Sequence, residues 1–136
     1  MNNLIDAIKA KYASSTLSDD VGGRIDLDES EDMTLPRIVW FVVTGRHDKN
    51  FTEDFNDVLI QFSIFVAKTA GIAAMTTIYN DLHALFDECA LTITGSTLVW
   101  MREMNLTTFM EPDTAPDGSS GIRAWHADYE LKSLAD

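Results

Sequence analysis

The residue types that most often carry out chemistry are sparse in this chain. Its histidines, His47, His83 and His126, stand far apart, and none has a cysteine, histidine or carboxylate at a known metal-ligand spacing. The single cysteine, Cys89, continues an apolar helical pattern without a neighbouring histidine, which favours a buried small side chain over a nucleophile. We therefore predict no catalytic residue, no metal site and no cofactor.

The densest run of carboxylates, Asp26–Asp32, is similar to a calcium-binding loop in composition only. An EF-hand loop needs Gly at its sixth position and Glu at its twelfth. Counted from Asp26, those positions hold Glu31 and Arg37. We interpret the run as a solvated connection, and a weak divalent-cation site formed between subunits stays open as the alternative.

Composition narrows the class of protein. The chain has 136 residues, enough for one domain spanning 1–136, and its 46% hydrophobic content can build a core. A net charge of −12 should repel nucleic acid and anionic membranes. An aromatic platform for nucleobases normally comes with basic residues, which are few here. No apolar run approaches the roughly 20 residues of a membrane span, and no secretory signal is visible, so we expect no contact with a membrane.

Periodicity predicts the elements that must position any site. Apolar residues at helical spacing indicate two helices, and runs rich in Val, Ile and aromatic residues indicate strands. The expected elements are a helix over Leu4–Tyr12, a short edge strand over Arg24–Leu27, strands over Arg37–Thr44 and Asp57–Val66, a helix over Thr69–Cys89 capped by Thr69, a turn over Leu91–Ser96, and strands over Thr97–Met110 and Ile122–Leu131. This order, α-β-β-β-α-β-β, predicts an α+β fold: an antiparallel four-stranded sheet, plus the edge strand, with two helices packed on one face.

Two of the expected strands, Ile38–Val43 and Val58–Val66, are apolar on both faces instead of alternating cleanly. In the second strand, the less apolar face has Leu59 and Phe65 at its ends and polar residues in its middle. Two helices cover only one side of a sheet, so we expect the other side to meet a second copy or a different protein. The predicted subunit-interface residues are Trp40, Leu59, Phe65 and Trp125.

Two charged connections are candidates for docking other proteins. The stretch 46–55 is long for a hairpin loop, so either the strands extend into it as a projecting ribbon or the loop has a function. The stretch 111–121 is rich in Pro, Gly and acidic residues. The predicted partner-docking residues are Arg46, His47, Lys49, Phe51, Asp113 and Asp117.

Taken in order, these features resemble the tail terminator or tail-completion proteins of phages, the family of the lambda-type minor tail protein U. The resemblance extends from Leu4 to Leu131 and rests on core patterns and their spacing. It is carried by the leading helix Leu4-Ile5…Ile8…Tyr12, by Leu35-Pro36-Arg37-Ile38-Val39, by Ile60-Gln61-Phe62-Ser63-Ile64-Phe65 after a charged loop, by Leu82…Leu85-Phe86-Asp87, and by Ala127-Asp128-Tyr129-Glu130-Leu131.

The resemblance implies a structural virion protein and no enzyme. Such a subunit assembles in the host cytoplasm into a ring, usually a hexamer, which caps the tail tube, stops its growth and offers the head-tail joining surface. Its implied partners are itself, the tail tube protein and a head-completion or connector protein, with DNA passing through the lumen without specific binding. The alternatives are another neck or head-completion component, or a small ligand-binding or enzymatic α+β domain.

Overall fold

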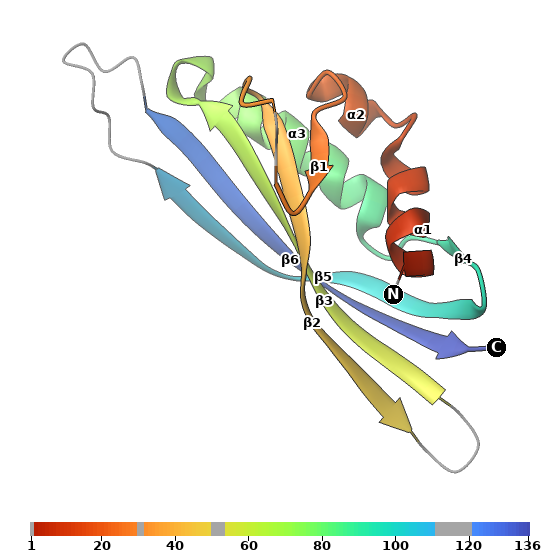
Figure 1. The fold of residues 1–136 in the computed structure, drawn as a ribbon. Coiled ribbons are helices and arrows are strands. Elements are labelled where there is room, and N and C mark those ends of the chain that lie inside the picture. The colour runs from red at the N-terminus through yellow and green to blue at the C-terminus, as the bar shows by residue number, and fades with distance from the viewer. Residues whose placement is uncertain (1, 30–31, 50–53, 111–120) are drawn as a thin grey trace.

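The computed structural model places helices on one face of a single β-sheet (Figure 1). It describes residues 2–29, 32–49, 54–110 and 121–136. Within these residues the elements are α1 (Asn2–Tyr12), α2 (Thr16–Asp20), β1 (Ile25–Leu27), β2 (Arg37–Lys49), β3 (Asp54–Ala67), the 3-10 helix η1 (Lys68–Ala70), α3 (Gly71–Phe86), β4 (Thr92–Ile93), β5 (Ser96–Met110) and β6 (Ile122–Ala135). None of the described helices has the length and apolarity needed to cross a membrane.

The α+β class is confirmed, but the sheet differs from the predicted one. The described strands form a six-stranded sheet in the order β1-β2-β3-β6-β5-β4. The expected edge strand is present as β1, and it runs parallel to β2, so the sheet is mixed. The extra strand β4 pairs with the start of β5 where we expected only a turn. Gly95, with φ of 81°, makes this tight reversal possible, and a two-residue strand has too little periodicity to predict.

The helix α2 was also missed, because it lies inside a connection rich in polar residues. The Ser15 side chain caps it by accepting a hydrogen bond from the Ser18 backbone N–H at 3.1 Å. Leu17 and Val21 are buried, at 1% and 0% exposed, and hold the short helix against the core. Five residues do not complete enough turns to show a helical period.

Several predicted boundaries are corrected. β2 and β3 continue as a paired ribbon to Lys49 and Asp54, which confirms the alternative in which the strands extend into the stretch 46–55. The predicted strand ends at Thr44 and Asp57 are corrected accordingly. The long helix is shorter than predicted, and Thr69 is not its N-cap: it lies within η1, and Ala70 precedes α3 without a side-chain cap. β6 extends to Ala135, four residues beyond the predicted end at Leu131.

Aromatic side chains form the centre of the core between the sheet and the helices. Phe62 stacks on Phe86 of α3 with ring centroids 4.8 Å apart and on Trp40 at 5.9 Å. Tyr129 meets Phe62 edge-on at 5.6 Å. Trp40 is fully buried, and its Nε1 donates a hydrogen bond to the Tyr12 hydroxyl of α1 at 3.2 Å. Strand alternation thus turns all three sheet aromatics toward the helices.

The burial of Trp40 can be tested by measuring the free energy of unfolding. Truncating such a large side chain leaves a cavity under α1, so Trp40→Ala should destabilise the fold by about 3–5 kcal/mol in urea unfolding. Val39→Ala, at the adjacent position on the opposite face, should cost no more than about 1 kcal/mol. Equal losses for the two variants would contradict the assignment of faces.

Two neighbouring carboxyl groups from different helices make the stability of the fold depend on pH. Burial and the neighbouring Asp81 of α3 raise the pKa of Asp20, at the end of α2, to about 6. In the unfolded chain an Asp pKa is about 3.9, so the folded state holds this proton more tightly. Stability is therefore lost as the pH rises from about 4 through 6, and the full penalty remains at pH 7.

We expect Asp20→Asn to remove this penalty. Because Asp20 is only partly buried, the gain at pH 7 should be about 1 kcal/mol, and it should vanish near pH 4. Thermal unfolding across this pH range measures the difference, with Asp6→Asn on the exposed side of α1 as the matched control. A gain that does not depend on pH would contradict the carboxyl pairing.

Candidate functional site

No described element covers the sheet face turned away from the helices (Figure 1). We call it the open face and define it by the strand register, since directly paired residues share a face. Its members are Arg37, Val39, Phe41 and Thr44 of β2, Asp57, Leu59, Gln61, Ser63 and Phe65 of β3, Trp100, Arg102, Asn105, Thr107 and Phe109 of β5, and Ala124, His126, Asp128, Glu130 and Lys132 of β6.

One end of the open face is apolar, and the Arg37 side chain holds its aromatic ring in place. The Arg37 guanidinium lies over the Phe65 ring, 4.6 Å from its centroid, and His126 meets the same ring edge-on at 6.3 Å. Arg37 is only 8% exposed, and its Nη1 donates a hydrogen bond to the Met33 carbonyl at 3.2 Å. These contacts hold Phe65 in place while leaving it partly exposed.

The middle of the open face is polar and cross-linked between strands. The Gln61 amide donates to Asp128 at 2.9 Å, and the Ser63 hydroxyl lies 2.7 Å from His126 Nδ1. Further along, Arg102 and Glu130 are 3.6 Å apart, and Lys132 and Asp57 are 3.9 Å apart. The open face is therefore mixed: the polar middle and apolar ends expected for β3 are found, but β6 presents mostly polar side chains.

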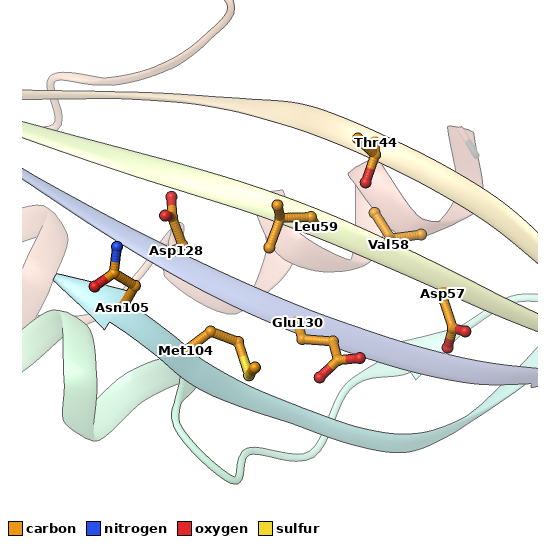
Figure 2. A pocket seen from close by; sticks show the side chains of 8 residues that line it. All are labelled: Thr44, Asp57, Val58, Leu59, Met104, Asn105, Asp128 and Glu130. Atoms are coloured by element: carbon orange, nitrogen blue, oxygen red, sulfur yellow. The ribbon is translucent and has the colours of Figure 1, made fainter. Parts of the chain in front are cut away.

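An open hollow of about 430 Å³ lies on this polar part. Figure 2 shows its lining residues: Thr44, Asp57, Val58, Leu59, Met104, Asn105, Asp128 and Glu130. Each of its three carboxylates already has a partner from a neighbouring position, as described above. In the described part of the chain, no group of three or more histidine, cysteine or carboxylate side chains is placed to hold a metal ion.

The four predicted interface residues separate onto two faces. Leu59 and Phe65 lie on the open face, as expected. Trp40 is in the core, and Trp125 turns toward α3, where it meets the Tyr79 ring edge-on at 5.6 Å. The placement of Trp40 at an outer surface is corrected, because it is fully buried and paired with the buried Phe62. Trp125 is half-buried on the helix side of the sheet, and its interface role stays a prediction.

The predicted docking residues are only partly described. Arg46, His47 and Lys49 belong to the ribbon of β2 and β3, where their backbones pair with Asp57, Asn56 and Asp54. They are strand residues and not loop residues, which is a further correction. Phe51, Asp113 and Asp117 lie outside the described residues.

Sequence reasoning missed a polar cluster between α3 and β5. The Tyr79 hydroxyl lies 2.7 and 2.8 Å from the two Glu103 carboxylate oxygens and can donate to them. His83 lies between Glu103 and Asp87, with ring nitrogens 3.2 and 3.4 Å from their oxygens. The Glu103 backbone N–H donates to Asp87 at 2.9 Å. The signal available was the helical spacing of Tyr79, His83 and Asp87, which places all three on one side of the helix.

This cluster fastens the helix to the sheet. Burial and the Glu103 carboxylate raise the pKa of Tyr79 to about 12, so the hydroxyl keeps its proton and remains a donor at neutral pH. A carboxylate on the helix-facing side of a sheet needs such partners to offset its desolvation. The arrangement explains how Glu103 is tolerated there.

Removing the donor should destabilise the fold. Tyr79→Phe leaves the Glu103 carboxylate short of a hydrogen bond, and we expect a loss of about 1–3 kcal/mol in urea unfolding. In a Glu103→Leu background the same substitution should cost much less, since no carboxylate remains to be satisfied. An unchanged cost in that background would show that Tyr79 acts by packing alone.

Comparisons with known proteins find similarity of structure only. No protein-family model matches the chain, and no curated protein matches it by sequence. A chain in the solved structure of the virion of a native gene transfer agent (GTA) particle matches with a TM-score of 0.71 and 11% identity, over 96% of this chain and 93% of that chain. A second solved structure matches with a TM-score of 0.58 and 9% identity, over 96% and 94% of the two chains. At these identities the comparison shows the fold alone: this chain shares the fold of a chain in the GTA virion.

Proposed function

We propose that this protein is a structural subunit of a phage-like virion that forms a ring on the end of the tail tube. The observation that carries the proposal is the fold shared, over nearly the full length of both chains, with a chain of the GTA virion. The ordered core patterns from Leu4 to Leu131 support the finer assignment as a tail terminator.

The open face and the charge of the chain support an assembly role. Leu59 and Phe65 are partly exposed on a sheet face that no described element covers, as is usual for a surface that meets another protein. The net charge of −12 suits a ring through which DNA passes without being gripped, since phosphate contacts need cations. We propose further copies of the chain, the tail tube protein and a head-completion or connector protein as partners.

The proposed mechanism depends on shape and needs no catalysis. Ring closure, with a hexamer as the proposed state, would set a fixed lumen. One side of the ring would bind the last ring of the tube and block the addition of further tube subunits. The opposite side would then offer the surface that joins the tail to the head. The protein would stay in the neck of the finished particle after assembly in the host cytoplasm.

Tube length tests this function. In particles assembled without the chain, electron microscopy should show tails that lack heads and exceed the normal length, because nothing stops tube growth. Phe65→Asp should reproduce this phenotype while the purified variant stays folded, since the new carboxylate would lie beside the Arg37 guanidinium. Asn80→Asp, which adds the same charge on the exposed side of α3, is the matched control and should assemble normally.

Other outcomes separate the competing functions. Headless tails of normal length would contradict the tail-terminator role and support a different neck or head-completion component. Normal particles in the absence of the chain would contradict any structural role in the virion.

A further inference from the structure

We infer that a second copy of this chain docks head-to-tail, with Asp28, Glu29, Asp32 and Met33, between its β1 and β2, placed at a groove between α3 and β5 of its neighbour. This inference rests on the proposed ring, and it names the surfaces that close that ring.

Each edge of the sheet consists of a short strand that covers only part of the long strand beside it, and the uncovered parts of the two edges complement each other. On one edge, β1 covers only positions 38–40 of β2 and leaves the rest of that strand without a described neighbour. On the other edge, β4 covers Ser96 and Thr97 of β5. The Met101 carbonyl accepts a hydrogen bond from the Glu88 backbone N–H at 2.7 Å, and the Glu103 N–H donates to Asp87, so the part of this edge without a described neighbour is Met104–Met110. The two short edge strands, β1 and β4, lie at opposite ends of the sheet. Two copies placed side by side therefore bring β1 of one against the open part of β5 of the other.

Strand direction favours the same arrangement. β2, β3, β6 and β5 alternate in direction across the sheet, so β2 and β5 run in opposite senses. When copies stand side by side in the same orientation, the two edges that meet are antiparallel, which is the more stable pairing. An exposed edge of this length is a ready template for another chain.

The groove lies at the end of β5, where apolar side chains are left exposed. Ile72 at the start of α3 and Phe109 are each 54% exposed, and Met110 is 39% exposed. With Thr108, Arg123 and Trp125 they line a hollow of about 200 Å³. The Arg123 Nε is buried and has no hydrogen-bond partner in the described part of the chain. The groove thus offers an apolar seat beside a cation that lacks a full set of acceptors.

The β1–β2 connection supplies the matching chemistry. Met33 is 64% exposed, more than any other large hydrophobic residue among those described as exposed. Asp32 precedes it, and Asp28 and Glu29 lie nearby on the same connection, all of them exposed. The Met33 carbonyl is held by Arg37, so this apolar side chain stands on an anchored backbone.

The connection and the groove lie at the same level of the sheet on opposite edges. Arg37, Phe65, Ala124 and Phe109 are paired in one row across β2, β3, β6 and β5. Met33 contacts one end of this row through Arg37, and the groove contains its other end, Phe109. A lateral shift of one copy therefore brings Met33 to the groove without tilting the sheet. Repetition of this contact between non-identical surfaces closes into a ring when the rotation permits.

Charge excludes the twofold alternative. A symmetric pairing of two β5 edges, or of two β1–β2 connections, would bring like surfaces together and leave Arg123 without an anionic partner. The head-to-tail contact places the acidic connection against Arg123. Like-charge contacts are costly across an interface, whereas complementary ones fix its register.

Cysteine crosslinking tests the contact on the full-length chain with Cys89→Ala as background. We expect a short bis-maleimide to join Met33→Cys chains to Phe109→Cys chains when the two single variants are mixed. Neither variant alone should give a dimer, and a chain carrying both should give a ladder that ends at the ring. Crosslinked dimers from Phe109→Cys alone would overturn the inference in favour of a twofold β5 contact.

A charge exchange provides the second readout. Arg123→Glu should weaken self-association by about tenfold or more in analytical ultracentrifugation, and adding Glu29→Arg should restore part of it. Glu88→Arg, at an exposed position beyond α3, is the control and should not restore association.

The possible failures are distinguishable. Rings seen by electron microscopy without the mixed crosslink would overturn this contact while leaving the proposed function intact. A chain that forms no ring either in solution or on tube ends would overturn both.

Discussion

The stack of Phe62 on Phe86, with centroids 4.8 Å apart, is the contact on which the rest of the structure depends. It joins the middle of β3 to the end of α3, and Trp40 and Tyr129 complete it from the neighbouring strands. Because side chains alternate along a strand, this contact decides the directions of the remaining side chains in β3 and β6, and in β2 as far as the register irregularity between Val42 and Thr44. One face becomes the core, and the other is left without a covering layer.

That one-sided arrangement links the fold to assembly. Three helices on one face leave the open face and parts of both sheet edges without described neighbours. Polar middle positions such as Gln61 and Asp128 satisfy each other across strands, which keeps much of the open face compatible with water. Exposed apolar side chains lie at one end of the sheet, where Met33, Phe109 and Met110 are found, and also along β2 and β5, where Val43, Val99 and Met104 are found. A protein built this way meets its partners through its edges as well as through its open face.

Carboxylate side chains have different roles at different places in the fold. Glu103 lies on the helix-facing side, where Tyr79 and His83 surround it and fasten α3 to β5. Glu130 lies on the open face and is matched by Arg102. Glu29 lies on an exposed connection, where it contributes to a negative surface. The net charge of −12 alone does not distinguish these roles, because each depends on what the strand register places opposite the carboxylate.

The sequence by itself determined the α+β class, the two main helices and the positions of the long strands, because apolar periodicity depends only on local spacing. It did not reveal β4 or α2, whose few residues carry no period, or the parallel placement of β1, which depends on a partner 13 positions along the chain. Trp40 and Trp125 show the main limit. An aromatic residue in a strand apolar on both faces can point either way, and only packing against Phe62, Tyr12 and Tyr79 decided that both point inward.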